Sequence, residues 1–148
     1  MRAVVQRVTT AEVQVDGERV GAVAPGAPGL LVLLGAGDGD DEGDATYLAK
    51  KIAGLRVFED DSGRMNLALT DVGGSLLVVS QFTLYGDTSK GRRPSFVDAA
   101  RPEQAEPLIE DLCRQLESLG ARVATGRFRA DMDVEIHNDG PITLMIEV

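Results

Sequence analysis

Apolar residues in the first part of the chain follow the patterns of β-strands. Val4 to Val8 predicts a first strand, and the valines at positions 13, 15 and 20 flank Asp16-Gly17, a pair that favours a tight hairpin turn. A loop rich in Pro and Gly is expected from Ala24 to Gly29. Leu30 to Leu34 is apolar on both faces, which is typical of a strand buried within a sheet. The chain therefore begins as β structure.

Two segments show the spacing of amphipathic helices. In the first, Asp44 is the expected N-cap, apolar residues recur at positions 45, 48, 49 and 52, and Gly54 is the expected end. The second runs from about Pro102 to Leu119, has apolar residues at positions 108, 109, 112 and 116 on one face, and stops at Gly120. Each helix therefore has one face for a core.

The remaining apolar runs predict more strands. These are Leu55 to Phe58, Leu76 to Gln81, an alternating segment at positions 132–136, and Leu144 to Val148. Strands outnumber helices and do not alternate with them regularly, which disfavours a doubly wound parallel sheet. The sequence predicts an α+β fold. We expect residues 1–148 to form one compact domain, with a curved, largely antiparallel, barrel-like sheet and two packed helices.

Composition narrows the setting in which the protein works. The chain has 148 residues, enough to build a core without disulfides, and a single cysteine, Cys113. It shows no signal-like or membrane-length apolar segment, so we expect a cytoplasmic protein with no membrane partner. Its net charge of −9 disfavours broad binding to DNA or RNA, because such binding depends on Lys and Arg that neutralise phosphates. Any contact with a polynucleotide is expected to be local.

One short basic run, Lys90-Gly91-Arg92-Arg93, is a candidate for such a local contact. Basic runs of this length are common on solvated loops, and that interpretation remains open. The run follows a polar motif closely in sequence, which favours a role near a binding site.

Two polar motifs, each next to apolar runs, carry the candidate chemistry. The first is Ser80-Gln81-Phe82-Thr83, at the end of the buried strand, and the second runs from Asn138 to Thr143. Ser and Thr at a strand end are commonly turn or cap residues. A buried strand that opens into uncharged hydrogen-bonding residues also presents backbone N–H groups at a cleft. We expect the motifs to form two halves of one site that stabilises an oxyanion.

Other patterns predict no cofactor and no metal. The segment Gly35-Ala36-Gly37-Asp38-Gly39 lacks the Lys-Ser or Lys-Thr of a phosphate-binding loop and is followed by acids. Those acids lack the twelfth-position Glu of a calcium loop. One histidine, His137, and one cysteine cannot close a zinc site. His137 lies on the polar face of a predicted strand, where an exposed residue is the simpler interpretation than a catalytic triad.

In their order along the chain, several motifs closely resemble those of the D-aminoacyl-tRNA deacylases. They are Ser80-Gln81-Phe82-Thr83-Leu84, Asp87-Thr88, Arg93-Pro94-Ser95-Phe96 and Asn138-Asp139-Gly140-Pro141-Ile142-Thr143. The resemblance spans the whole chain and extends to Gln6-Arg7-Val8, Gly73-Gly74-Ser75 and Thr125-Gly126-Arg127-Phe128. The chain departs from the family in having Ile142 where Val is usual, an enlarged loop at 24–29, and a bulky Tyr85.

The resemblance implies hydrolysis of the ester that joins a D-amino acid, or glycine, to the terminal adenosine of tRNA. Backbone N–H groups at Gln81, Phe82 and Thr83 would stabilise the oxyanion, and the family favours that of Phe82. The ribose 2′-hydroxyl would assist proton transfer, so that no metal and no general base is needed. Ser80 and Thr83 would shape the site, and Gln81 would orient the adenosine or the substrate amine. Thr83 as a nucleophile is the competing interpretation.

The resemblance also implies a homodimer with its active site at the subunit interface. A cis Gly140-Pro141 turn of one subunit would enter the partner's pocket and exclude the side chain of an L-amino acid, with Asn138 and Thr143 in the same motif. The sequence alone favours a trans bond there. Lys90, Arg92 and Arg93 would contact the acceptor stem of tRNA.

Two other functions remain open from the sequence. One is an editing deacylase of the same fold that acts on a mischarged L-aminoacyl-tRNA. The other is a noncatalytic tRNA-binding homodimer, against which the net charge counts.

Overall fold

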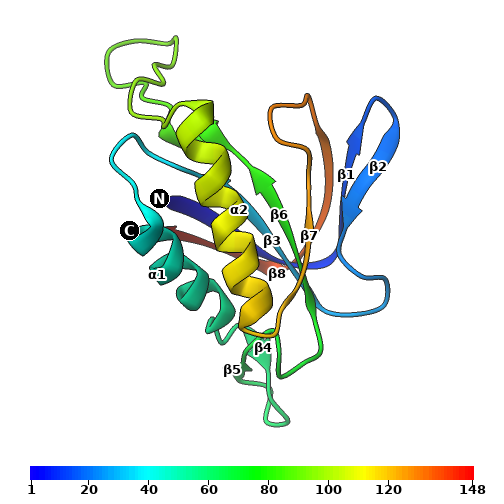
Figure 1. The fold of residues 1–148 in the computed structure, drawn as a ribbon. Coiled ribbons are helices and arrows are strands. Elements are labelled where there is room, and N and C mark those ends of the chain that lie inside the picture. Colours follow the sequence, from blue (N-terminus) through cyan, green and yellow to red (C-terminus); the bar gives the residue numbers. More distant parts are fainter.

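The computed structural model describes all 148 residues, and its sheet is organised around one long strand (Figure 1). This strand, β1 (Arg2–Val15), pairs antiparallel with β2 (Glu18–Ala22), β3 (Gly29–Gly35) and β8 (Asp133–Glu147). Beyond β3 the pairing becomes parallel, first to β6 (Ser75–Ser80) and then to β7 (Arg122–Thr125). The α+β fold class is confirmed, with a six-stranded mixed sheet.

The sheet curves until it is nearly closed into a barrel. Strand β2, at one end of the strand order, contacts β7 at the other end. The contact is so close at Gly21 that a Cβ atom there would collide with the carbonyl oxygen of Thr125. Glycine is therefore required where the two edges of the barrel meet.

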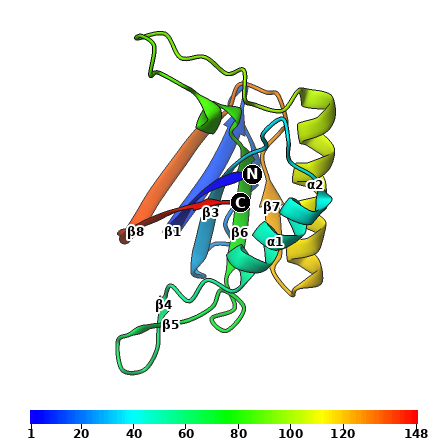
Figure 2. The same cartoon turned by 90° about the vertical axis from the view of Figure 1, so that its left-hand side faces the viewer.

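Both helices cover one face of the sheet, as Figure 2 shows. Helix α1 (Glu42–Ala53) packs against α2 (Pro102–Ser118). The Gln115 side chain joins the helices by donating to Thr46 Oγ1 at 2.6 Å. The small elements are β4 (Phe58–Glu59), β5 (Met65–Leu67) and a 3₁₀ turn, η1 (Phe82–Tyr85). No helix combines the length and apolar composition needed to cross a bilayer.

Strands β3 and β6 separate two hydrophobic cores. Alternate residues of each strand point to opposite faces of the sheet. Leu30, Val32, Leu76 and Val78 belong to the core of 22 buried residues that includes the helices, whereas Leu31, Leu77 and Val79 belong to a core of 7 inside the barrel. The continuous apolar runs at 30–34 and 76–79 follow from burial on both faces.

Several expected boundaries needed correction. The N-cap of α1 is Asp41, not Asp44, and Asp44 instead closes the capping box as residue N3. The strand expected at Leu55 to Phe58 is reduced to Phe58–Glu59. The two C-terminal strands are one strand, β8, with an interruption in its pairing to β1. Strands β5 and β7 were not predicted, because each is too short to show a clear period.

The hairpin and the second helix agree with expectation. Asp16 and Gly17 both have positive φ, 51° and 78°, as a type I′ turn requires. Helix α2 begins at Pro102 as predicted and buries Leu108, Leu112 and Leu116.

Shortening a side chain in the helix-side core tests this packing. Leu112 is fully buried on α2, so Leu112→Ala should lower the free energy of unfolding by about 2–5 kcal/mol through lost burial and a residual cavity. Val97 is 82% exposed, and Val97→Ala should stay within about 0.5 kcal/mol of the parent. Urea unfolding measures both, and equal losses in the two variants would contradict the assigned core.

Candidate functional site

A cavity of about 570 Å³ opens where β3 and β6 end, between the sheet and the start of α2. Of its 18 lining residues, 13 are hydrophobic. They come from the ends of β3 and β6, from η1, from residues 96–109, from the loop between β7 and β8, and from the start of β8. This volume and apolar lining are typical of sites for small ligands or for part of a larger one.

Free backbone amides occur at Phe82, which lines this cavity, and at the next residue, Thr83. Strand pairing continues through Gln81, whose N–H donates to the carbonyl of Leu34 at 2.8 Å. The chain then turns into η1, and the N–H groups of Phe82 and Thr83 have no acceptor within the protein. The first amides of a helical turn lack internal partners for the same geometric reason. The Gln81 amide is therefore part of the sheet, and the amides of Phe82 and Thr83 remain without a protein acceptor.

Aromatic and amide side chains surround these two amides. The Phe82 ring is 57% exposed and meets Phe96 edge to face, with the ring centres 5.1 Å apart. Phe128 lines the cavity as well. The Gln81 side-chain amide donates a hydrogen bond to the hydroxyl of Thr83. Ser80 and Gln81 line the cavity, and Thr83 follows them on η1.

The cavity contains almost no ionisable group. Arg129 is the sole charged residue among those that line it, and no Asp, Glu, His, Lys or Cys side chain takes part. Arg129 has a φ of 62°, a conformation that non-glycine residues adopt infrequently. His137 is exposed beside Glu135, with 3.6 Å between Nε2 and Oε1, and does not line the cavity. No cluster of His, Cys, Asp and Glu side chains suited to a metal ion occurs in the structure.

The second motif forms a protruding turn within β8. Pairing with β1 is interrupted between Asn138 and Thr143, and Gly140-Pro141 bulges outward with both residues exposed. The Gly140–Pro141 peptide bond is cis, as the family resemblance implied. The Asn138 side chain donates to the carbonyls of Arg7 and Ile142, at 2.9 and 3.0 Å, and closes the base of the turn.

Arg7 ties this turn to the rest of the chain. It is only 8% exposed, and its Nη1 donates to the carbonyl of Val57 at 2.7 Å. Its Nε lies 3.1 Å from Asp139 Oδ2, close enough for an ion pair but at an angle that makes no hydrogen bond. The Thr143 hydroxyl donates to Asn138 Oδ1 and accepts from the Gln6 side chain. The turn is therefore held from both sides.

Within one chain the two motifs do not meet. Asn138 pairs with Val8, and Val8 pairs with Gly29 at the start of β3, whereas Ser80 pairs with Leu34 near the end of β3. Five residues of strand separate these levels, roughly 16 Å along the sheet. None of residues 138–143 lines the cavity. The expectation that the motifs form halves of one site is therefore not met by a single subunit.

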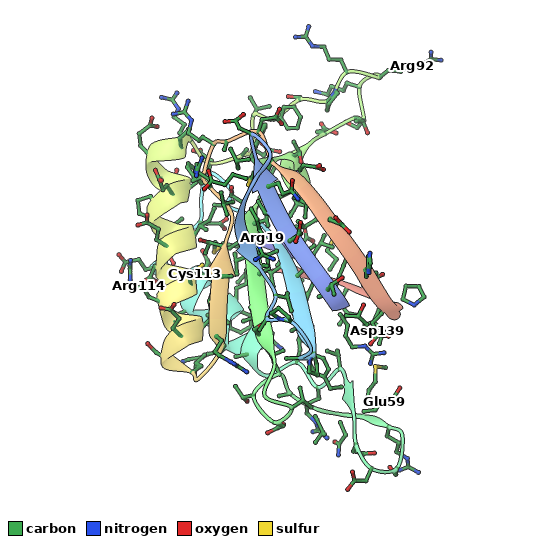
Figure 3. The ribbon with its side chains drawn as sticks, turned by 90° about the vertical axis from the view of Figure 1, so that its right-hand side faces the viewer. Arg19, Glu59, Arg92, Cys113, Arg114 and Asp139 are labelled. Atoms are coloured by element: carbon green, nitrogen blue, oxygen red, sulfur yellow. The ribbon has the colours of Figure 1, made fainter.

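The basic run lies on an extended loop. Lys90, Arg92 and Arg93 are exposed and form no ion pair. Figure 3 places Arg92 on this projecting loop and Asp139 far from it, toward the other end of the sheet. The loop follows η1 directly, so it begins at the cavity.

Sequence reasoning missed part of the site. Phe96, Phe128 and Arg129 line the cavity. The first two belong to motifs that resemble the family, but nothing in the sequence was a reason to place them in the site. Arg129 lies one residue past such a motif and had no signal. Arg7 also matched a family segment, but its burial under the Gly140-Pro141 turn depends on strand pairing across 131 residues.

Known proteins match the chain over its full length. The family model described as D-Tyr-tRNA(Tyr) deacylase matches residues 4–147. A D-aminoacyl-tRNA deacylase of Heliobacterium modesticaldum is 58% identical, covering 99% of this chain and 96% of that protein, and one of Halalkalibacterium halodurans is 57% identical, covering 99% of each.

Solved structures show the same fold. One described as "c-Myc DNA Unwinding Element Binding Protein" has 41% identity and a TM-score of 0.91, covering 100% of this chain and 99% of its own. One described as "a probable eukaryotic D-amino acid tRNA deacylase" has 14% identity and a TM-score of 0.81, covering 99% and 98%, and bears on the fold alone. The family match and the relatives show that this chain belongs to the D-Tyr-tRNA(Tyr) deacylase family, hydrolases of the aminoacyl-tRNA ester bond.

Proposed function

We propose that this chain hydrolyses D-aminoacyl-tRNA in the cavity at the ends of β3 and β6, with the amides of Phe82 and Thr83 as oxyanion donors. The observation that carries the proposal is the unpaired amide of Phe82, a residue that lines the apolar cavity, with the unpaired amide of Thr83 next to it in sequence. Backbone amides that already point at the reacting oxygen stabilise developing charge without reorganising. The reaction belongs to the cytoplasm, where aminoacyl-tRNAs are used in translation.

The cavity suits the terminal adenosine of tRNA. Its volume lies in the range of small-ligand sites, and Phe82, Phe96 and Phe128 offer aromatic surfaces for a base. Arg129 supplies one cation for a phosphate of the terminal nucleotides. Ser80 and Gln81, which also line the cavity, offer hydrogen bonds to the ribose or to the amine of the amino acid.

Hydrolysis requires little beyond these donors. Water attacks the ester carbonyl, the bond to the ribose oxygen breaks, and that oxygen takes a proton to leave free tRNA and the amino acid. The cavity offers no carboxylate, imidazole or amine to act as a base. The ribose 2′-hydroxyl, adjacent to the ester, assists the proton transfer in our proposal.

Thr83 acts by shaping the site in this proposal. Its hydroxyl accepts a hydrogen bond from the Gln81 side chain, and no base lies beside it to remove its proton. An unactivated hydroxyl is a weak nucleophile. The Gln81–Thr83 bond instead links the two residues on either side of Phe82.

Discrimination against L-amino acids requires a second subunit. The Gly140-Pro141 turn is exposed, is held by Arg7 and Asn138, and does not reach its own cavity. In a homodimer this turn enters the partner's cavity and places carbonyl oxygens where an L side chain would lie. Glycine has no side chain to exclude, so glycyl-tRNA is a substrate too. The outer edge of β8 leaves Met145 69% exposed and is suited to the dimer contact.

The loop at 88–93 provides a local contact with the tRNA acceptor stem. Lys90, Arg92 and Arg93 are exposed, have no acidic partner, and follow η1 at the cavity. The net charge of −9 confines nucleic-acid contact to such places. The relative described as a DNA-binding protein makes a DNA oligonucleotide a necessary competitor in binding tests.

The first test compares D-tyrosyl-tRNA with L-tyrosyl-tRNA. Purified protein should hydrolyse the D-ester and spare the L-ester, measured as loss of aminoacyl-tRNA against spontaneous hydrolysis without protein. Cleavage of only the L-ester would establish an editing deacylase of the other chirality. Binding of tRNA without cleavage of either ester would leave a noncatalytic binding protein, and equal competition by DNA would contradict a tRNA-specific contact.

Substituting proline at position 82 tests the oxyanion donor. Proline lacks an N–H but is well tolerated at the first position of a helical turn, where that N–H has no internal partner. Phe82→Pro should lower kcat by about 10²–10³-fold relative to Phe82→Ala, which loses the same ring but keeps the amide. Single-turnover deacylation of D-tyrosyl-tRNA measures the difference, and equal rates in the two variants would remove this amide from the mechanism.

Thr83→Val completes that comparison. It removes the hydroxyl while keeping the shape of the side chain and the amide, so the rate should stay within about tenfold of the parent if Thr83 only shapes the site. Abolished cleavage, with a covalent intermediate trapped in the parent, would make Thr83 the nucleophile.

A heterodimer tests which subunit supplies the Gly140-Pro141 turn. Gly140 has a φ of 120°, and a Cβ atom there would lie 2.8 Å from Ile142 Cγ1, so Gly140→Ala distorts the turn. This variant should cleave L-tyrosyl-tRNA at least about tenfold faster relative to the D-ester than the parent does, a loss of about 1.4 kcal/mol of discrimination.

The diagnostic species combines Gly140→Ala in one subunit with Phe82→Pro in the other, purified by two different tags. Its working cavity belongs to the Gly140→Ala subunit and receives an intact turn from the Phe82→Pro subunit. D-selectivity should therefore return, whereas persistent cleavage of the L-ester would show that each turn serves its own subunit or none.

A further inference from the structure

The turn that carries the two free amides has little of its own to hold it. Element η1 is a single 3₁₀ turn with no buried residue, and its N-cap Gln81 makes no side-chain capping bond. Phe82 and Thr83 are both exposed. A short turn of this kind needs an external anchor if its amides are to stay aimed at a substrate oxygen.

Tyr85, the last residue of η1, packs its ring against two glycines and one arginine. A Cβ on Gly35 would lie 3.3 Å from ring atoms, and a Cβ on Gly37 would lie only 2.9 Å from them. The guanidinium carbon of Arg2 lies 4.4 Å from the ring centre. Arg2 Nη1 also donates to the carbonyl of Leu84 at 3.0 Å. The end of η1 is therefore in contact both with β1 and with the end of β3 and the residues that follow it.

The Tyr85 hydroxyl reaches the same segment. It donates to Asp40 Oδ2 at 3.3 Å, and the same oxygen accepts from the Gly37 N–H at 2.5 Å. The other Asp40 oxygen lies 2.6 Å from the amino group of Met1. Burial, and next the charge of Asp40, raise the pKa of Tyr85 to about 12, so the hydroxyl keeps its proton at neutral pH.

We propose that Tyr85 is a positioning residue. By packing its ring against Gly35 and Gly37, it fixes η1 and so keeps the Phe82 and Thr83 amides in place at the cavity. The inference rests on the proposed function, since it assigns a purpose to the amides that the function uses. Tyr85 makes no contact with the cavity itself and acts through η1.

A purely structural role for Tyr85 is the alternative, and the packing argues against it. Tyr85 belongs to neither hydrophobic core. It lines instead an open polar crevice of about 430 Å³, together with the first two residues of the chain, residues 37–40, Asp98 and the last two residues. Losing its ring should therefore cost the fold little compared with a core residue such as Leu112.

Glycine substitutions provide a matched pair of variants. Gly37→Ala introduces a Cβ against the Tyr85 ring and must displace it, whereas Gly39→Ala introduces a Cβ with nothing within 4 Å. Both glycines have backbone conformations open to alanine. Gly37→Ala should lower kcat on D-tyrosyl-tRNA by about tenfold to a hundredfold, because a 1 Å displacement of catalytic groups lowers the rate by factors of that size. KM should stay within about twofold of the parent value. Gly39→Ala should match the parent.

Coupling between positions 37 and 85 is the decisive measurement. Tyr85→Ala should also lower kcat, and Gly37→Ala/Tyr85→Ala should be no slower than Tyr85→Ala alone, because the added Cβ then has no ring to displace. If the kcat of the double variant is lowered by the product of the two single-variant factors, the two positions act independently and the proposal is overturned. A change in KM with unchanged kcat would also overturn it, since that would indicate a contact with substrate.

An amide readout keeps this test independent of activity. In ¹H–¹⁵N spectra, the Phe82 and Thr83 cross-peaks should shift in Gly37→Ala and Tyr85→Ala and remain in place in Gly39→Ala. Unmoved cross-peaks would refute the positioning role whatever the enzyme does. If the cross-peaks shift in these two variants while the parent protein cleaves no D-ester, the positioning role is upheld and the proposed function is refuted.

Discussion

Burial of β3 and β6 on both faces is the constraint on which the rest of the structure depends. One face of this parallel pair supports the helices and the other fills the barrel. Neither strand can therefore slip or turn early without exposing a core. Pairing ends where Gln81 donates to Leu34, and the next two amides, of Phe82 and Thr83, are left without partners. The free donors are thus a consequence of where the central pair ends, and no charged side chain is needed to create them.

The same sheet separates the second motif from the first. Strand β1 pairs first with β3 and then with β2, and β8 pairs with β1 along both parts. The interruption of β8 at Gly140-Pro141 therefore falls near the start of β3, whereas the cavity lies near the end of β3. Arg7 and Asn138 hold the turn outward, away from its own core. The turn is exposed and does not line the cavity of its own chain. This position is compatible with the proposed homodimer, in which the turn would meet the cavity of the partner.

Local patterns were sufficient for most of the fold and for the two motifs. The Asp16-Gly17 hairpin, the doubly buried strands and the face of α2 each follow from side chains close in sequence. Residues brought together by distant pairing were not predictable in the same way. The Gly21 contact with Thr125, the burial of Arg7 and the place of Arg129 in the cavity depend on barrel closure and strand register. Short β7, paired only to β6, had no period to detect.

An active site built on backbone amides has a consequence for selectivity. In the proposed mechanism the Phe82 and Thr83 amides would bind any carbonyl oxygen equally and would carry no information about the amino acid attached to it. The apolar cavity, with Arg129 as its single charge, can recognise the nucleotide that all aminoacyl-tRNAs share. In the proposed mechanism, neither feature distinguishes D from L. In that mechanism, D- and L-amino acids must therefore be distinguished by a separate group that contacts the amino-acid side chain. The Gly140-Pro141 turn is exposed and is held by Asn138 and Arg7, so it is the element proposed for this contact.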